Sequence, residues 1–216
     1  MQIEIQQSEF RAKEATMNPI RQGLLFVLSA PSGAGKDTVI QALQAQGADF
    51  YLVQSMTTRA PRPGESDGHP YFFVDQARFD HMLANNKLLE HALVHGNWYG
   101  QPRQPIRDNL QAGRDVLLKI DVQGAASVRR LIPDAVFIFL HPGSDEELAQ
   151  RLQARQTETE EQLKIRRADA VKELAEQHWY DYLVFNRHGR LQDAVDDVRA
   201  IIRSEHCRVT PRQIVL

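Results

Sequence analysis

Short apolar runs alternate along this sequence with segments of helical periodicity. Each run is bounded by glycine, proline or polar residues and has the length of one strand buried on both faces. Strands that alternate with helices predict a mainly parallel sheet that helices cover on both sides. We therefore expect an α/β fold with a doubly wound parallel sheet. The runs lie at 24–28, 51–53, 116–120, 135–140 and 182–185, and the helical segments at 37–46, 123–131, 144–153, 159–176 and 191–202.

Composition narrows the class of protein. The 216 residues, of which 42% are hydrophobic, suit one domain with a substantial core. The 26 Lys and Arg against 28 Asp and Glu give a formal net charge of −2, so no net basic field attracts nucleic acid or an anionic membrane. The single cysteine, Cys207, excludes an intrachain disulfide. No apolar run approaches the ~20 residues that span a bilayer, and we expect a cytoplasmic protein without membrane or nucleic-acid partners.

A glycine-rich loop follows the first apolar run and directly precedes a helix. This strand–loop–helix context is the one that a Walker A phosphate loop requires. Gly33 and Gly35 allow a tight backbone path that turns successive N–H groups toward phosphate oxygens, and Lys36 adds a point charge. The sequence therefore predicts a site for a polyphosphate, as in ATP. Its residues are Ala30, Pro31, Ser32, Gly33, Ala34, Gly35, Lys36, Asp37 and Thr38.

Two residues depart from the usual phosphate-loop pattern. Ala30 stands where the first glycine is usual, and Asp37 stands where a Ser or Thr would place its hydroxyl on magnesium. A carboxylate is a hard oxygen donor of the kind that Mg²⁺ prefers. We expect Mg²⁺ to accompany ATP, with Asp37 as a direct or water-mediated ligand. The alternatives are that Thr38 takes this role, or that Asp37 is only the first-turn carboxylate that helices favour.

Two stretches break the alternation of runs and helices. Residues 57–100 combine prolines, glycines, an amphipathic helix near 75–85 and the aromatic pair Trp98-Tyr99, which predicts an inserted subdomain. Residues 151–167 are rich in Arg, Glu and Thr, which suits a solvated, movable flap. Residues 1–20 lack the apolar core of a signal peptide, and we expect a flexible leader there, with a short extra helix as the alternative. The expected domain spans 23–205, with an insertion at about 56–101, a lid at about 151–168, and a C-terminal tail at 206–216.

The inserted segment carries a longer motif. From residue 57 it reads Thr-Thr-Arg-Ala-Pro-Arg-Pro-Gly-Glu-Ser-Asp-Gly and continues to Tyr71. This string closely resembles the GMP-binding signature of guanylate kinases, and the resemblance extends from about Gly23 to Glu205. It implies a P-loop NTPase fold with an acceptor-binding subdomain and a mobile lid. Further matching segments are LLE at 88–90, GNWYG at 96–100, IDVQG at 120–124 and RLQAR at 151–155.

The resemblance also implies which residues bind the acceptor. Two arginines three residues apart can form charge-assisted hydrogen bonds to a monophosphate, and tyrosine hydroxyls can donate to its other oxygens. A guanine pocket needs a carboxylate and a hydroxyl or amide, which adenine would leave unpaired. Without the motif, a solvated basic loop and a surface carboxylate would explain the same residues. The implied GMP-binding residues are Ser55, Arg59, Arg62, Glu65, Tyr71, Glu90, Tyr99, Gln101 and Asp121, with Gln101 standing where the family usually has Ser or Thr.

Phosphoryl transfer depends on alignment and on cations that neutralise charge on the phosphate oxygens. By resemblance the lid supplies such cations, although a salt-bridged surface helix would also explain its arginines, and Asn186 lies near the adenine of ATP. Lys119 stands where the family usually has Asp or Glu, and we hypothesise that the extra carboxylate of Asp37 compensates for it. The implied catalytic residues are Lys36, Arg59, Arg151, Arg155 and Arg166.

The resemblance therefore implies an ATP:GMP phosphotransferase of purine nucleotide metabolism that recycles GMP. One alternative is a sugar-phosphate kinase that acts on a ribose bisphosphate precursor and can also carry Gly-Lys-Asp in its loop. The intact motif from Thr57 to Tyr71 argues against it. The other is a non-catalytic guanylate kinase-like module that binds peptides, and Lys36 with the lid arginines argues against that. Whether the chain is a monomer or a homo-oligomer stays open.

Overall fold

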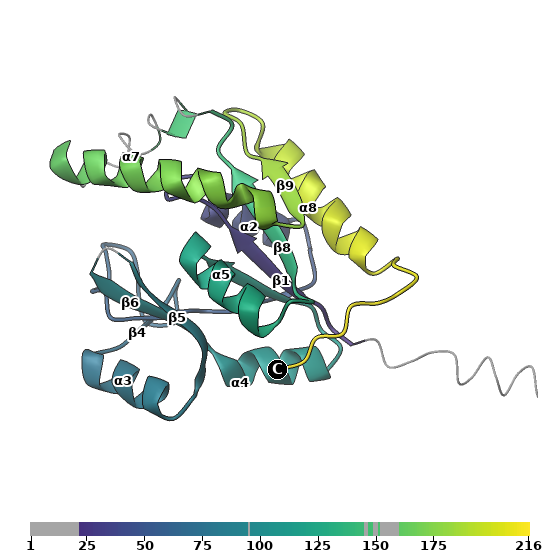
Figure 1. Ribbon diagram of the computed structural model, residues 1–216, viewed down its shortest axis with the longest axis horizontal. Coiled ribbons are helices and arrows are strands. Elements are labelled where there is room, and N and C mark those ends of the chain that lie inside the picture. Colours follow the sequence, from purple (N-terminus) through teal and green to yellow (C-terminus); the bar gives the residue numbers. More distant parts are fainter. Residues whose placement is uncertain (1–21, 95, 145–146, 149–150, 152–159) are drawn as a thin grey trace, which may run out of the picture.

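The computed structural model describes residues 22–94, 96–144, 147–148, 151 and 160–216, with only the backbone for 160–167. A central sheet carries helices on both faces, and a smaller sheet lies beside it (Figure 1). Within the described segments, every helix is too short or too polar to cross a membrane.

The central sheet has five parallel strands in the order β2–β7–β1–β8–β9. Each of the apolar runs forms one of these strands, which confirms the predicted α/β class. All of β1 is buried, because a parallel strand covered on both faces is almost continuously apolar instead of alternating. The bounds are β1 Leu25–Ser29, β2 Tyr51–Leu52, β7 Val116–Ile120, β8 Val136–His141 and β9 Tyr182–Phe185.

Helices cover the two faces of this sheet as a doubly wound fold requires. The crossover from β1 to β2 runs one way across the sheet, whereas those from β7 to β8 and from β8 to β9 run the other way. Because such crossovers are right-handed, α2 lies on one face and α5 and α7 on the other (Figure 1). The last helix, α8, packs on α2. The bounds are α2 Lys36–Ala45, α5 Val122–Leu131, α7 Glu160–Ala175, η1 Glu176–Trp179 and α8 Leu191–Glu205.

A second sheet is built from the predicted insertion. Its four strands lie in the order β4–β3–β6–β5, with β3 and β5 both antiparallel to β6. It has its own small core, in which Met56, Phe79 and Leu88 are buried and Trp98 stacks on Phe79 at 5.8 Å between ring centroids. The bounds are β3 Met56–Thr57, β4 Phe72–Phe73, α3 Gln76–Ala84, β5 Leu88–Val94 and β6 Asn97–Pro102.

One α-helix among the described residues was not predicted. Helix α4, Arg103–Gln111, follows β6 directly and leads into β7. Only Ile106 and Leu110 of its residues are buried, so the apolar stripe is too sparse to stand out in the sequence. The predicted helix at 75–85 is confirmed as α3, where the side chain of Asp75 caps the first turn by accepting from the backbone N–H of Arg78.

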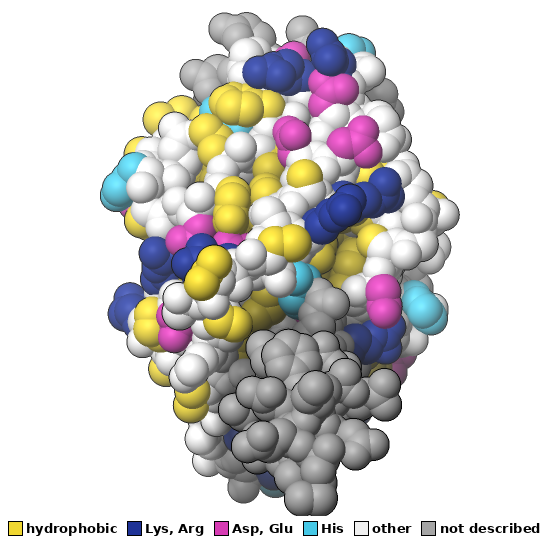
Figure 2. Space-filling view, turned by 90° about the vertical axis from the view of Figure 1, so that its right-hand side faces the viewer, with side chains coloured by type: hydrophobic (Ala, Val, Ile, Leu, Met, Phe, Trp, Pro, Cys, Tyr) yellow, Lys and Arg dark blue, Asp and Glu magenta, His cyan; other side chains and the backbone are white. Residues whose placement is uncertain are grey.

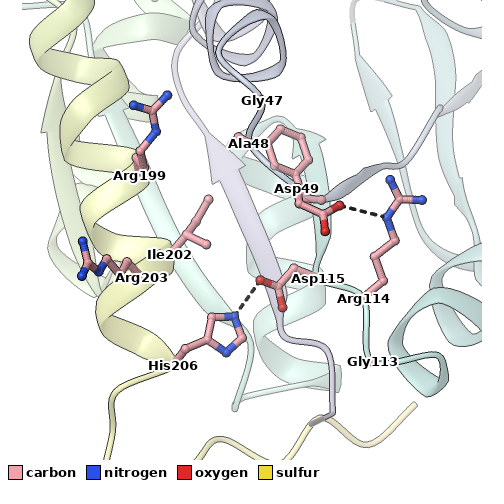
Figure 3. Close-up of a pocket in the computed structure, with 11 residues that line it drawn as sticks. Gly47, Ala48, Asp49, Gly113, Arg114, Asp115, Arg199, Ile202, Arg203 and His206 are labelled. Carbon is pink, nitrogen blue, oxygen red and sulfur yellow. Dashed lines mark hydrogen bonds and ion pairs between the residues drawn. The ribbon is translucent and has the colours of Figure 1, made fainter.

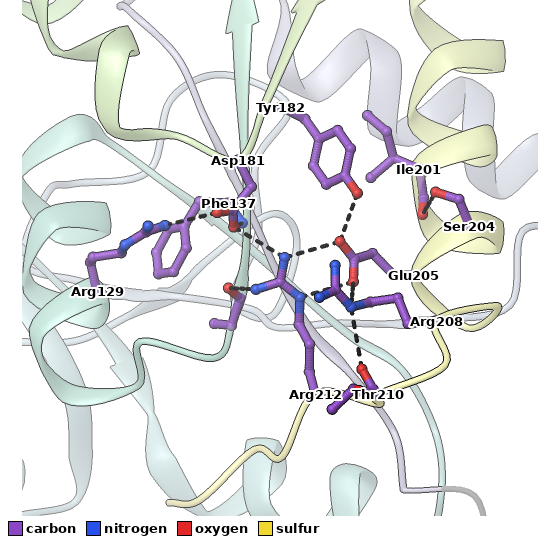
Figure 4. Close-up of polar contacts among 11 residues, drawn as sticks. Arg129, Phe137, Asp181, Tyr182, Ile201, Ser204, Glu205, Arg208, Thr210 and Arg212 are labelled. Carbon is purple, nitrogen blue, oxygen red and sulfur yellow. Dashed lines mark hydrogen bonds and ion pairs between the residues drawn. The ribbon is translucent and has the colours of Figure 1, made fainter.

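The C-terminal segment returns to the central sheet after α8 (Figure 4). The guanidinium of Arg212 donates to both carboxylate oxygens of Glu205, at 2.9 and 3.0 Å, and to the backbone carbonyl of Ala135. Tyr182 donates its hydroxyl to the same carboxylate at 2.7 Å. Burial alone would raise the pKa of Glu205, but the hydrogen bonds from Arg212 and Tyr182 lower it. The segment is therefore fixed by a buried, fully paired carboxylate.

Candidate active site

The phosphate loop lies between the carboxyl end of β1 and the first turn of α2. Gly33 and Gly35 have φ angles of 89° and 94°, in the left-handed region that glycine adopts without a Cβ clash. The Lys36 ammonium donates to the carbonyl of Ala30 at 2.9 Å, across the loop. This end of β1 is also where the crossovers diverge to the two sides of the sheet, which is where open α/β sheets bind ligands.

Two side chains from distant segments hold the loop at Ala34. The side-chain amide of Asn186, which follows β9, donates to the Ala34 carbonyl at 2.8 Å. Arg151 donates to the same carbonyl at 3.1 Å and to the backbone carbonyl of Asn186 at 2.7 Å. A Cβ at Gly35 would lie 2.4 Å from the Asn186 amide nitrogen, so the glycine is also required for this close approach.

A carboxylate that we did not predict lies at the mouth of the loop. Glu173 of α7 accepts a hydrogen bond from the backbone N–H of Ser32 at 3.3 Å. Burial lowers the pKa of Lys36, and the nearby charges of Glu173, Asp121 and Asp37 act against this shift. Glu173 thus occupies the kind of position that the loop offers to a phosphate oxygen.

The two residues that depart from the family pattern contact each other. The ammonium of Lys119, at the carboxyl end of β7, donates to a carboxylate oxygen of Asp37 at 2.6 Å. It also lies 4.8 Å from the ring centroid of Tyr71 in the insertion. Burial alone would lower the pKa of Lys119, but its interactions with Tyr71 and Asp37 raise it. The Asp37–Lys119 pair therefore joins the phosphate loop to the predicted acceptor segment.

Arg59, which we predicted to bind the acceptor phosphate, contacts a carboxylate and an aromatic ring. The Arg59 guanidinium donates to both oxygens of Glu65, at 3.0 and 2.9 Å, and its central carbon lies 5.6 Å from the Tyr71 ring centroid. Tyr71 in turn meets the ring of Tyr99 edge-on at 5.7 Å. Glu65 also accepts from the backbone N–H of Arg62 at 2.7 Å, which fixes the turn between the two arginines. The side chain of Arg62 itself is exposed.

Buried polar side chains from β5, from β6 and from the residue before β3 form a polar pocket. Ser55, Glu90 and Gln101 are 3%, 4% and 1% exposed, and the Gln101 amide nitrogen is 2.5 Å from the Ser55 hydroxyl. One carboxylate oxygen of Glu90 and the amide oxygen of Gln101 have no hydrogen-bond partner among the described residues. Buried polar atoms normally have partners, so this pocket offers hydrogen-bonding groups to a ligand.

The carboxylate of Asp121 connects this pocket to the central sheet. Asp121 caps α5 by accepting from the backbone N–H of Gly124 at 2.7 Å. A Cβ at Gly124 would lie 2.9 Å from a carboxylate oxygen of Glu90 and 3.2 Å from one of Asp121, so this glycine leaves room for both carboxylates. Burial, and secondly the charge of Asp121, raise the pKa of Glu90 to about 8.

Comparison with known proteins assigns this arrangement to a family. The model of the guanylate kinase family matches residues 22–205. The chain belongs to the guanylate kinase family. A guanylate kinase of Lactobacillus johnsonii is 47% identical over 194 residues, covering 89% of this chain and 94% of that one. The chloroplastic/mitochondrial guanylate kinase 2 of Oryza sativa subsp. japonica is 43% identical over 197 residues, covering 91% and 69%.

A solved structure supports the same assignment. The crystal structure of guanylate kinase from Anaplasma phagocytophilum has a TM-score of 0.73 and 33% identity, and covers 88% of this chain and 89% of its own. The chain is therefore a nucleoside-monophosphate kinase. Membership of the guanylate kinase family supports phosphorylation of GMP as its function, and favours neither the sugar-phosphate kinase nor the non-catalytic binding module.

The structure brings most of the residues implied by the guanylate kinase resemblance to one region, at the carboxyl ends of β1 and β7 and the facing side of the insertion. Of the three implied lid arginines, the structure describes the side chain of Arg151 alone. Arg151 contacts the phosphate loop, whereas Arg155 lies outside the described residues. Arg166 belongs to helix α7, and its side chain lies outside the described part.

A pocket of about 360 Å³ lies at the opposite edge of the central sheet (Figure 3). Its lining comes from the residues before β2, the residues before β7 and the last turns of α8, hence from the amino ends of the strands. There His206 contacts Asp115 at 2.6 Å, and Asp115 accepts from the backbone N–H of Leu24. None of the implied site residues lines this pocket, and it is not the candidate active site.

Proposed function

We propose that the chain transfers the terminal phosphoryl group of ATP to GMP at the carboxyl edge of the central sheet, with the residues described above in specific roles. The phosphate loop and Lys36 hold the phosphates of ATP, Arg151 and Asn186 close the donor side, and the insertion holds GMP. We assign the reaction to the cytoplasm and to purine nucleotide metabolism. Family membership supports the reaction, and the geometry supports the roles.

The unpaired atoms of the buried pocket carry the guanine assignment. Guanine presents two adjacent donors, N1–H and the N2 amino group, which one carboxylate can accept together, and it presents O6 as an acceptor. Glu90 and Gln101 offer atoms without partners among the described residues. Adenine has an acceptor at N1 and no N2 amino group, so it cannot make the two hydrogen bonds that the Glu90 carboxylate accepts from guanine, at a cost of roughly 1–3 kcal/mol. The pocket therefore favours guanine.

The phosphate of GMP would lie between the insertion and the phosphate loop. Arg59, already placed by Glu65 and the Tyr71 ring, would donate to this phosphate together with the hydroxyls of Tyr71 and Tyr99. An oxygen of the GMP phosphate forms a bond to the γ-phosphorus of ATP. The bond from that phosphorus to the β–γ bridging oxygen breaks, and its electron pair leaves with ADP. Lys36, Arg151 and the loop N–H groups neutralise the charge on the transferred group.

Guanylate kinases generally require a divalent metal, and we propose Mg²⁺. In the described residues, no group of three or more acidic, His or Cys side chains is arranged to hold a metal by itself. This fits Mg²⁺, which keeps several waters and uses one or two protein oxygens together with nucleotide phosphates. Asp37, whose side chain is 61% exposed, and Thr38 would contribute those oxygens. Bound with ATP, the metal would neutralise charge on the β- and γ-phosphates.

Neither the net charge nor the face shown in Figure 2 favours a large anionic partner. On the face shown in Figure 2, Lys and Arg side chains are interspersed with Asp and Glu and form no continuous basic surface. With a formal net charge of −2, the chain suits small phosphorylated substrates bound at a local site. We propose ATP and GMP as its ligands.

The test of the guanine assignment is a change in acceptor preference. Glu90→Gln would replace the carboxylate by an amide of the same shape, which cannot accept both donors of guanine. We expect kcat/KM for GMP to fall about tenfold or more, while the affinity for ATP is unchanged. Arg78→Gln, on the exposed surface of α3, is the control. An unchanged kcat/KM for GMP in Glu90→Gln would contradict the assignment.

A further inference from the structure

Lys119 lies at the junction of the two proposed subsites. Its side chain is only 10% exposed, although it carries a charge at the edge of the central sheet. On the donor side it contacts Asp37, the residue after Lys36, and on the acceptor side it faces the ring of Tyr71. The ammonium is also close enough to Lys36 for the two charges to repel each other. A second lysine therefore stands beside the phosphate-loop lysine.

The cations near the proposed phosphate sites each lie close to a carboxylate. Lys119 contacts Asp37, Arg59 contacts Glu65, and the charge of Lys36 is balanced in part by Glu173. The Tyr71 ring lies between two of these cations, because both Lys119 and Arg59 approach it. In the absence of nucleotides, each cation is thus balanced by a carboxylate near the path that phosphates would occupy.

A structural salt bridge is a poor explanation for the Asp37–Lys119 pair. Taking an ammonium out of water costs free energy, and an ion pair with a solvent-exposed partner contributes little in return. Asp37 is largely exposed, whereas Lys119 is nearly buried. A phosphate at this junction would supply a second, stronger partner for the ammonium.

We propose that Lys119 binds the phosphate of the acceptor nucleotide in this chain, and that Asp37 positions its ammonium until the nucleotide arrives. The proposal rests on the proposed function, because it assumes a nucleoside monophosphate in the insertion. When GMP binds, a phosphate oxygen takes the place of the Asp37 carboxylate as the acceptor from Lys119. The same ammonium then lies between the acceptor phosphate and the phosphate loop, and it offsets their mutual repulsion. Asp37 is released toward the donor side.

The test compares binding of GMP with binding of guanosine, which lacks the phosphate. Both are titrated calorimetrically without ATP and without metal, so that a role of Asp37 toward a metal does not enter. The proteins are the wild type, Lys119→Met, Lys119→Arg, Asp37→Asn and the control Lys87→Met, an exposed lysine of the insertion. Thermal unfolding of each variant checks that it folds.

We expect Lys119→Met to bind GMP about tenfold or more weakly and guanosine with unchanged affinity. Lys119→Arg should keep most of the GMP affinity. Asp37→Asn should bind GMP as well as the wild type or more tightly, because the competing carboxylate is gone. Lys87→Met should match the wild type.

Two results would overturn the proposal. One is unchanged GMP affinity in Lys119→Met, and the other is an equal loss of GMP and guanosine affinity, which indicates a structural role. If Lys119→Met does not fold, weaker GMP binding by Asp37→Asn contradicts the proposal instead. Wild-type turnover of GMP separates the two claims: if the wild type phosphorylates GMP and the Lys119 variants bind it normally, only this inference fails.

Discussion

The carboxylate of Glu173 lies 3.3 Å from the backbone N–H of Ser32, at the mouth of the phosphate loop. A negative charge at this position competes with the phosphates of an incoming nucleotide for the same donors. Helix α7 thereby contacts the loop directly through this side chain. Removing the charge should ease nucleotide binding without removing any group that we assign to the nucleotide.

Glu173→Gln should therefore bind ADP several-fold more tightly than the wild type. The amide keeps the shape of the side chain but removes the repulsion between its charge and the phosphates. Calorimetric titration of ADP without metal measures the effect. Asp169→Asn removes a charge from a half-exposed position of the same helix, one turn away from Glu173, and should change the affinity little. Weaker ADP binding by Glu173→Gln would show that the carboxylate supports the loop instead of competing with its ligand.

Gly35 is required for two reasons, its positive φ angle and its close contact with Asn186. Gly47 has the first feature without the second, so a comparison of the two glycines separates the two effects. Gly35 and Gly47 both have positive φ angles, but a Cβ at Gly47 meets nothing within 4 Å, whereas one at Gly35 meets Asn186. Gly47→Ala should cost about 1–2 kcal/mol of unfolding free energy from backbone strain alone. Gly35→Ala should lose a similar amount and, in addition, bind ADP about tenfold more weakly. Urea unfolding and ADP titration measure both, and equal ADP affinities in the two variants would contradict this account.

The raised pKa of Glu90 predicts a pH dependence of GMP binding. Guanine donors stabilise the ionised carboxylate, so GMP binds best where Glu90 has lost its proton. Between pH 7 and about 8, affinity should rise as Glu90 ionises, and it should level off above. The GMP phosphate titrates near pH 6 and is already ionised in this range. GMP titrations across this range, with Glu90→Gln as the pH-independent control, measure the effect; affinity that falls as pH rises would refute the assignment.

The same pKa predicts how the stability of the unliganded chain depends on pH. The folded carboxyl keeps its proton up to about pH 8, whereas in the unfolded chain it ionises near its ordinary value of 4.5. In this window the folded state binds more protons, so Glu90 makes the unfolding free energy fall as pH rises. In Glu90→Gln the unfolding free energy, measured by urea unfolding, should fall less between pH 5 and pH 8 than in the wild type. An identical slope in both proteins would show that Glu90 is not protonated in the folded state.

The C-terminal segment is predicted to contribute to stability but not to catalysis. Arg212→Ala would leave the carboxylate of Glu205, which is 2% exposed, without its main partner, at a cost of about 3 kcal/mol. Arg208 lies 3.7 Å from the same carboxylate but is half-exposed, so Arg208→Ala should cost less than about 1 kcal/mol. Urea unfolding distinguishes the two. Equal losses, or a change in kcat of the folded Arg212→Ala enzyme, would contradict the prediction.

The sequence predicted the central sheet well, because each parallel strand is buried on both faces and is therefore a nearly continuous apolar run. It predicted the second sheet poorly. Strands such as Met56–Thr57 and Phe72–Phe73 have only two residues each, and such short strands carry no periodicity. The first exists because it pairs with β6, more than 40 residues away in the chain, and the second because it pairs with the first.

In the candidate site, too, the residues within local motifs could be predicted, whereas contacts between distant segments could not. Glycines and Lys36 of the phosphate loop follow a local pattern, and resemblance to a family supplied the acceptor residues. Glu173 was missed because it lies in a helix with no motif of its own, and only folding brings it to Ser32. The sequence suggested that Asp37 compensates for the charge of Lys119, but it did not predict that the two side chains form an ion pair. Contacts between residues 82 positions apart depend on the register of β1 and β7.

The most direct test of the central claim is formation of ADP from ATP and Mg²⁺ with GMP, AMP, UMP or a ribose bisphosphate as the acceptor. Lys36→Ala, which removes the phosphate-loop charge, is measured alongside. This account predicts rapid turnover with GMP, little with the other three, and loss of activity in Lys36→Ala. Turnover with the ribose bisphosphate and not with GMP, or no turnover with any acceptor, would contradict it.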